Sequence, residues 1–78
     1  MIDEIKGRRN FAANLRARME ELSLSQSELA RRANVKQPQI SEYIRGNQSP
    51  SLFAALRIAE AVSLSIEDLC VAPLAQAS

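Results

Sequence analysis

Apolar residues recur along the chain at intervals of three and four, which is the spacing of an amphipathic helix, and no stretch shows the sustained alternation of a strand. The positions that carry this spacing are Phe11, Leu15, Met19, Leu22, Leu29, Ala33, Ile40, Ile44, Leu52, Leu56, Ala59, Val62, Ile66 and Leu69. The pattern predicts an all-α chain of five helices, near residues 8–22, 26–33, 37–45, 52–62 and 66–71. Signals before Phe11 and after Val71 are weak, so we expect both ends to fray.

Polar residues with helix-start chemistry place two of these helices closely. Ser25 precedes the second helix with Glu28 three residues later, and Ser65 precedes the fifth with Asp68 at the same spacing. In this arrangement each side chain binds a backbone N–H that the first turn leaves unpaired. The sequence therefore predicts reciprocal caps at both starts.

The connection between the second and third predicted helices is short, residues 33–36. Asn34 within it suits the left-handed conformation in which a helix often ends. Pro38 is tolerated in the first turn of a helix, Gly46 can end the third helix, and Ser51 can cap the fourth. The second and third helices are therefore expected to cross steeply through a tight turn.

Composition removes several classes of function. The chain has one cysteine and no histidine, so it has no internal disulfide, no usual zinc ligands and no imidazole to activate Cys70. With two glycines it has no phosphate-cradling loop. We therefore expect no enzyme activity, no cofactor and no metal, and we interpret Cys70 as a small apolar filler beside Leu69.

The length of 78 residues suffices for one core, so we expect a single domain over 1–78 with its core at about residues 8–71. No run approaches the ~18 apolar residues that cross a bilayer. Asp3 and Glu4 stand where a signal peptide carries bases. The expected location is cytoplasmic and nucleoid-associated, away from any membrane.

The net charge of +1 is unevenly distributed. Residues 1–50 hold nine basic and six acidic residues, whereas residues 51–78 hold one basic and three acidic residues. An anion-binding surface is therefore expected in the first half of the chain.

Two short helices joined by a tight turn, the second polar on one side, are the pattern of a helix-turn-helix, whose second helix enters the major groove of DNA. At about 100° per residue, Ile40, Tyr43 and Ile44 lie on the buried side of the third helix. The candidate base-contacting residues on its other side and at its tip are Gln37, Pro38, Gln39, Ser41 and Glu42. Glutamine pairs with adenine and glutamate accepts from cytosine, which suits base reading.

Affinity for DNA comes mainly from phosphate contacts. The candidate phosphate-contacting residues around the reading helix are Ser25, Gln26, Lys36, Arg45, Asn47 and Gln48. Arg9 and Arg16 are further candidates, whereas Arg31 and Arg32 are interpreted as ordinary surface charge. Three interpretations of Glu42 stay open: it reads cytosine, it pairs with Arg45, or it repels phosphate.

Short motifs stand in register over roughly residues 11–69. They are Leu15-Arg16, Leu24-Ser25-Gln26-Ser27-Glu28-Leu29-Ala30, Val35, Ile40-Ser41, Arg45-Gly46, Pro50-Ser51-Leu52, Ile58-Ala59 and Leu64-Ser65-Ile66-Glu67-Asp68-Leu69. Together they resemble the lambda-repressor and Cro-like (XRE-type) helix-turn-helix regulators. The resemblance implies a five-helix domain in which Gln26 contacts phosphate, positions 37, 38 and 42 face base edges, and Asn47 and Gln48 contact the backbone or an adjacent base. It also implies binding to double-stranded DNA as symmetric dimers on palindromes.

Several positions depart from that family. Met19 and Ile44 are apolar where members often carry an Arg and a Glu that pair, and we interpret them as a packed contact that still fixes the third helix. Ser63 stands where Gly is favoured and is expected to cost strain. Lys36 replaces a capping Ser or Thr, and Pro38 limits readout at its position to apolar contact.

The expected function is sequence-specific transcriptional regulation by a homodimer on a palindromic operator, with the third helix in the major groove. The fifth helix and the tail offer an apolar dimer surface made by Leu64, Ile66, Leu69, Val71 and Leu74. The alternative is an antitoxin of the same fold that binds a toxin and regulates its own operon. A further protein partner, either polymerase or a toxin, therefore stays open.

Overall fold

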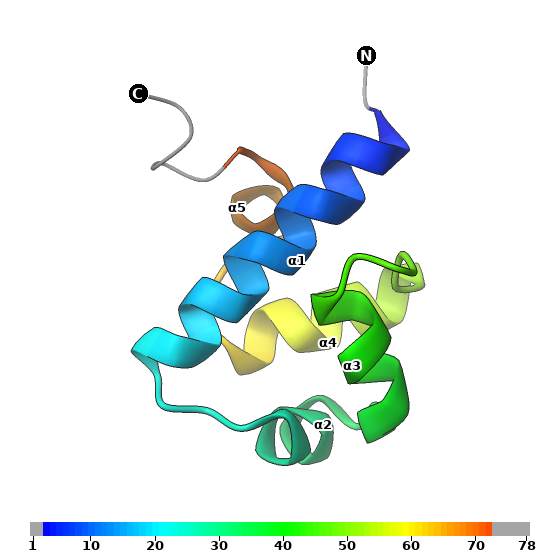
Figure 1. The fold of residues 1–78 in the computed structure, drawn as a ribbon. Helices are drawn as coiled ribbons and strands as arrows, with labels where there is room; N and C mark the ends of the chain where they lie inside the picture. The colour runs from blue at the N-terminus through cyan, green and yellow to red at the C-terminus, as the bar shows by residue number, and fades with distance from the viewer. Residues whose placement is uncertain (1–2, 73–78) are drawn as a thin grey trace.

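The computed structural model describes residues 3–72, which form five α-helices and no strand (Figure 1). The helices are α1 (Glu4–Glu21), α2 (Gln26–Ala33), α3 (Gln37–Ile44), α4 (Leu52–Ala61) and α5 (Ile66–Cys70). The long α1 packs against α3 and α5, while α2 packs against α3 and α4. The all-helical prediction is confirmed, and the bounds of α2 to α5 agree with it within one residue. None of these described helices is long and apolar enough to span a bilayer.

The first helix begins at Glu4, earlier than the predicted start near residue 8. Asp3 caps it, because its Oδ1 accepts hydrogen bonds from the backbone N–H groups of Ile5 (2.9 Å) and Lys6 (3.2 Å). Glu4 adds negative charge in the first turn, where the helix dipole favours it. The expectation of fraying up to Phe11 is therefore wrong, since a polar cap rather than apolar spacing stabilises this start.

Helices α1 to α4 end alike, each followed by a residue in the left-handed region. These residues are Ser23 (φ 53°), Asn34 (φ 54°), Gly46 (φ 75°) and Ser63 (φ 59°). After α4, the N–H of Ser63 binds the carbonyl of Glu60 and the N–H of Leu64 binds that of Ala59, which is the Schellman arrangement. The predictions for Asn34, Gly46 and Ser63 are confirmed, whereas Ser23 was missed.

Serine side chains cap α4 and α5 as predicted. Ser51 Oγ accepts from the N–H of Ala54 (3.3 Å). At α5 the box is reciprocal, because Ser65 Oγ accepts from the N–H of Asp68 (2.9 Å) and the Asp68 carboxylate accepts from the N–H of Ser65 (3.1 Å). The start of α3 has no side-chain cap, in keeping with Lys36 at that position.

The cap of α2 forms only in part. Ser25 Oγ accepts from the N–H of Glu28 (3.1 Å), but the Glu28 carboxylate turns to Arg31 and Arg32 instead of returning to the Ser25 backbone. The prediction of a reciprocal box is therefore wrong here, because two guanidinium groups one turn further on compete for the carboxylate. The hydrogen bond from Arg31 also holds the pKa of Glu28 below its ordinary value.

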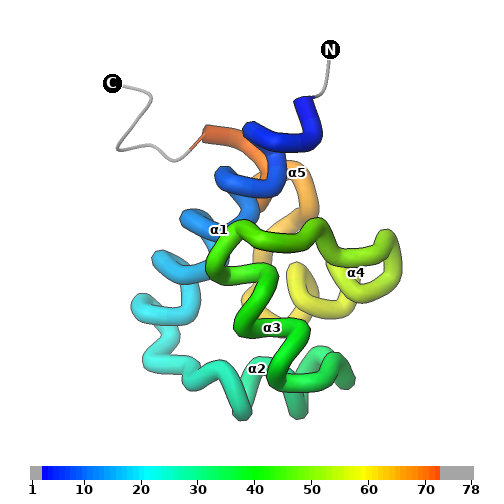
Figure 2. The backbone as a smooth tube through the Cα atoms, turned by 45° about the vertical axis from the view of Figure 1, so that its right-hand side comes forward, coloured from blue at the N-terminus to red at the C-terminus, as the bar shows by residue number. Residues whose placement is uncertain are grey.

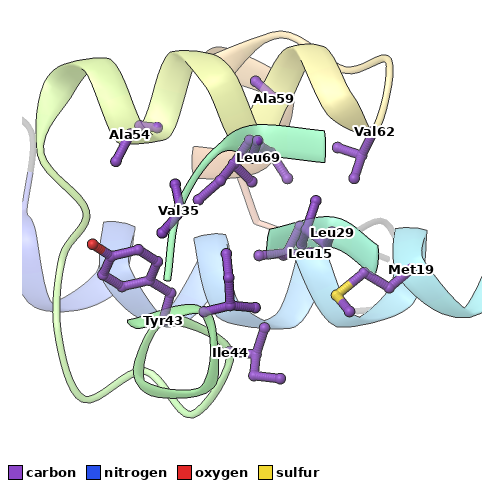
Figure 3. Close-up of a cluster of buried hydrophobic side chains, with 14 of the residues drawn as sticks. Leu15, Met19, Leu29, Val35, Tyr43, Ile44, Ala54, Ala59, Val62 and Leu69 are labelled. Carbon is purple, nitrogen blue, oxygen red and sulfur yellow. The ribbon is translucent and has the colours of Figure 1, made fainter. Parts of the chain in front are cut away.

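The described helices share an apolar core (Figure 3). Its fully buried large side chains are Leu15, Leu29, Ile40, Ile58, Val62 and Leu69. Met19 of α1 and Ile44 of α3 are both buried in this core. Burying one such side chain contributes about 1.5–3 kcal/mol, so an apolar substitute for an ion pair can hold α3 against α1.

The fourth helix turns its small residues inward. Ala54, Ala55 and Ala59 are buried, with Ile58 between them, whereas Leu52, Phe53 and Leu56 are exposed. Leu52 and Leu56, which carry the helical spacing in the sequence, therefore lie outside the core. Their spacing fits a helical face, but alanines let the helix approach the core closely on another face and leave the bulky side chains outside.

Side chains of α1 and α4 bind carbonyl groups at the ends of other helices. Arg16 donates to the Ile44 carbonyl at the end of α3, and Arg18 Nε donates to the Val62 carbonyl after α4 (2.8 Å). Arg57 Nε donates to the last carbonyl of α2 (3.0 Å). A cation at a helix C-terminus also interacts favourably with the helix dipole.

The end of α5 is bound in the same way by two asparagines of α1. Asn14 Nδ2 lies 2.8 Å from the carbonyl oxygens of both Leu69 and Val71, and Asn10 Nδ2 lies 3.0 Å from that of Cys70. Through these bonds and the two arginines, α1 contacts the ends of α3, α4 and α5.

Candidate nucleic-acid interface

The third helix is anchored on one side and exposed on the other. Ile40, Tyr43 and Ile44 are buried, while Pro38 and Arg45 are exposed. In Figure 2, α3 lies towards the viewer, with α2 beneath it and the following loop above. The predicted faces of this helix are therefore confirmed, and Tyr43 is a core residue.

The tip of α3 carries three exposed residues in sequence, Gln37, Pro38 and Gln39. Within residues 3–72, the side chains of Gln37 and Gln39 make no hydrogen bond to the protein. Their amide groups are thus available to a ligand. Pro38 in the first turn fixes the backbone without removing a helix hydrogen bond, since its N–H would have had no partner.

A side-chain hydrogen bond joins the two helices of the motif. Ser41 Oγ donates to Gln26 Oε1 over 2.6 Å, and both residues are partly buried. Because Ser41 uses its proton on Gln26, it orients the glutamine amide, which keeps its two N–H donors. This bond was not foreseen from the sequence, where Ser41 was expected to contact bases directly.

Glu42 is held by the loop that follows α3. Its carboxylate accepts from Asn47 Nδ2 (2.9 Å), and the backbone N–H of Asn47 binds the Glu42 carbonyl (3.1 Å). No ion pair joins Glu42 to Arg45 among the described residues. Of the interpretations left open for Glu42, pairing with Arg45 is therefore wrong, because the loop returns Asn47 to the carboxylate.

The remaining candidate phosphate-contacting residues are exposed at the ends of α2 and α3: Ser25, Lys36, Asn47 and Gln48. Arg31 and Arg32 lie elsewhere on α2 and both pair with Glu28, which is in keeping with their interpretation as surface charge. No group of acidic and cysteine side chains suited to a metal ion occurs within residues 3–72.

The candidate dimer residues are less exposed than expected. Leu69 is fully buried, so its prediction as a dimer contact is wrong: it fills the core beneath α5. Leu64 and Ile66 are partly buried against the core, and Val71 is 57% exposed. Leu74 lies outside the described residues.

Cys70 is exposed, and its interpretation as an apolar filler is wrong. Partial desolvation raises the pKa of its thiol above the ordinary value.

Two helices joined by a short turn, the second buried on one side and polar at its exposed tip, define a helix-turn-helix DNA-binding domain. A helix-turn-helix family profile matches residues 15–69, and the chain belongs to this family, of the Cro/C1 (XRE) type. The protein is accordingly a DNA-binding transcription regulator.

Solved structures of regulators share the fold. A hypothetical transcription factor from Neisseria is 25% identical with a TM-score of 0.83, over 96% of this chain and 86% of that one. The restriction-modification controller protein C.AhdI from Aeromonas hydrophila is 26% identical with a TM-score of 0.74, over 80% of this chain and 94% of its own. The clp gene regulator ClgR from Corynebacterium glutamicum is 26% identical with a TM-score of 0.74, over 80% of this chain and 66% of its own. No curated protein sequence matches the chain significantly.

Proposed function

We propose that the protein binds a palindromic operator as a homodimer and inserts α3 into the major groove, where it reads the DNA sequence. The observation that carries this proposal is the exposed tip of α3, where Gln37 and Gln39 present unused amides on a helix that is anchored by its other side. A glutamine amide matches the donor and acceptor pattern of adenine in the major groove.

The other polar side chains of α3 have supporting roles. Glu42 offers a carboxylate that can accept from cytosine beyond its bond to Asn47, and Pro38 offers apolar contact to a thymine methyl group. Ser41 acts through Gln26, since its hydroxyl is used in orienting that amide.

Phosphate contacts surround this reading surface. Gln26 lies in the first turn of α2, where free N–H groups and the helix dipole favour an anion, and Ser25 precedes it. Lys36 precedes the first residue of α3, Arg45 follows its last residue, and Asn47 and Gln48 lie in the loop after it. These contacts position α3 without discriminating sequence.

Dimerisation is part of the proposal because a net charge of +1 gives a single copy little general attraction for DNA. The proposed contact surface is the outer side of α5, with Val71 exposed and Leu64 and Ile66 partly exposed. Two copies related by a two-fold axis would present their α3 helices to half-sites about one helical turn apart.

The test is selection of bound duplexes from a random pool at fixed salt, using the wild type, Gln37→Ala and Lys36→Ala. The wild type is expected to enrich a palindrome. Gln37→Ala should relax the motif at one position, with a loss of about 1–3 kcal/mol for the preferred base.

Lys36→Ala serves as the contrasting variant, because loss of a phosphate contact weakens all sequences alike and lowers the salt slope by about 1. Enrichment of no motif, or an affinity that is insensitive to salt, would show that the proposed function is wrong.

A further inference from the structure

A surface hollow of about 340 Å³ lies between α1 and the end of α3. Its lining residues are Arg9, Ala12, Arg16, Arg45, Gly46 and Asn47, and we call it the arginine hollow. Gly46 lies beside Ala12 at ordinary packing distance, since a Cβ on the glycine would lie 3.7 Å from the alanine Cβ. This contact, which brings the loop beside α1 in Figure 2, gathers three guanidinium-bearing residues from two elements.

The charge of the arginine hollow is not neutralised by the described part of the protein. The ion pairs within residues 3–72 use Arg18, Arg31 and Arg32, and none of them uses an arginine of the hollow. No acidic residue lines it either. The Glu42 carboxylate, which is bonded to the lining residue Asn47, is the one acidic group described beside three guanidinium groups, and the excess of positive charge favours an anion.

Arg16 connects this hollow to the reading helix. One of its N–H groups binds the carbonyl of Ile44, the last residue of α3, and a guanidinium has five such donors. An anion bound by the remaining donors would thus be joined through one rigid group to the backbone of α3.

The hollow also lies at a suitable distance from the tip of α3. The eight steps along the chain from Gln37 to Arg45, at about 1.5 Å of rise each, span about 12 Å. The major groove is about 8.5 Å deep, so a helix of this length that enters it tip first keeps its other end at the level of the bordering backbone.

We propose that the arginine hollow binds one phosphate group of the DNA backbone at the edge of the groove, through Arg9, Arg16 and Arg45. The inference rests on the proposed function and extends the interface from the helix-turn-helix to α1. The phosphate fixes how deeply α3 enters the groove, because Arg16 holds both the phosphate and the end of that helix.

The first test measures binding of the selected operator by Arg9→Ala. The variant is expected to bind roughly tenfold more weakly, on operator and unrelated DNA alike, with its salt slope reduced by about 0.9 and its selected motif unchanged. Arg32→Ala is the matched control, since it removes the same charge from an arginine that is paired with Glu28. Equal losses in the two variants would overturn the proposal.

A second test assigns the phosphate. Backbone phosphates of the operator are replaced one at a time by uncharged methylphosphonate, and each duplex is tested with wild type and Arg9→Ala. At one position per half-site the two changes are expected not to add, which is the sign of a direct contact. Arg16→Lys, which keeps the charge but loses the planar fork, should show the same coupling, with its melting temperature reporting that it folds.

Other results have a definite meaning. If no methylphosphonate position couples to Arg9 while inorganic phosphate shifts the Gly46 amide resonance of the free protein, the hollow binds a small phosphate compound and the proposal is wrong. If a motif is selected but Arg9→Ala changes nothing, this inference fails while the proposed function stands. Failure of the proposed function is recognised separately, by the absence of any motif in the wild type.

Discussion

At the scale of single residues, the strain of the fold is concentrated in the left-handed positions after helices. Ser23, Asn34 and Ser63 have positive φ although each carries a side chain. The left-handed conformation costs an L-residue about 1–2 kcal/mol, and asparagine tolerates it better than serine. At the two serines, the left-handed conformation therefore lowers the free energy of unfolding, and glycine at the same positions would avoid this cost.

Substitution of Ser63→Gly is expected to stabilise the protein. Relief of the left-handed strain should raise the free energy of unfolding by about 1 kcal/mol, or the melting temperature by roughly 4–8 °C. The measurement is thermal unfolding followed by circular dichroism. Ser27→Gly, at an exposed helical position in α2, is the control and should lower stability instead. An unchanged or lower melting temperature for Ser63→Gly would show that strain at this turn is negligible.

Residue types with one dominant local role were predictable, and residues with several available partners were not. Asn34 and Ser65 have the local conformations that their sequence context indicates. Glu28 instead pairs with two arginines, and Ser41 donates to Gln26, which the fold brings near. Several hydrogen-bond partners of similar strength compete for such a side chain, and the spacing of residues in the sequence does not show which partner it binds.

At the scale of elements, polar side chains of α1 complete the ends of three other helices. Arg16, Arg18 and Asn14 each donate to carbonyls that have no other hydrogen-bond donor within residues 3–72. Carbonyl groups left without partners on folding cost about 1–3 kcal/mol each when buried. The position of α1 is thus fixed by directional bonds as well as by its apolar face.

Asn14→Ala is expected to loosen α5. The variant loses the donor shared by the carbonyls of Leu69 and Val71, so the free energy of unfolding should fall by about 1–3 kcal/mol. Denaturant unfolding gives the loss, and hydrogen exchange of the α5 amides shows where protection decreases. Asn10→Ala removes a single exposed hydrogen bond, to the Cys70 carbonyl, and should lower the free energy of unfolding by less. A greater loss in Asn10→Ala than in Asn14→Ala would contradict this account of how α5 is held.

Helix existence followed from periodicity, but helix orientation did not follow everywhere. On α3 one strongly apolar side decides the buried face, and the prediction holds. On α4 both a leucine side and an alanine side have helical spacing, and close packing selects the alanines. Hydrophobicity alone favours burial of the leucine side, because it takes no account of the space available between helices.

At the scale of the whole molecule, residues 3–72 expose two apolar regions suited to association. One is the α5 side with Val71, and the other is the exposed side of α4, where Leu52 and Phe53 are 65% and 66% exposed. The sequence predicted the first region, but the second was recognised only from the structure, which shows that Leu52 and Phe53 lie outside the core. The proposed dimer uses the α5 side.

Val71→Glu is expected to convert the dimer to monomer. A buried unpaired carboxylate in each half of a symmetric contact is unfavourable, so the dissociation constant should rise at least roughly tenfold. Sedimentation equilibrium over a range of concentrations measures it. Phe53→Glu introduces the same charge on α4 and should leave the equilibrium unchanged. Dissociation by Phe53→Glu and not by Val71→Glu would move the interface to α4.

The bonds from α1 to α5 also set the order in which the domain can be completed during synthesis. Asn10 leaves the ribosome early, yet its carbonyl partner at Cys70 follows 60 residues later. Until then the side chains of Asn10 and Asn14 have only water as a partner, and the core lacks Leu69. The nascent chain therefore cannot close its core turn by turn. It must wait for its last helix, so a ribosome stalled before α5 would hold a chain with its apolar surface still open to chaperones and proteases.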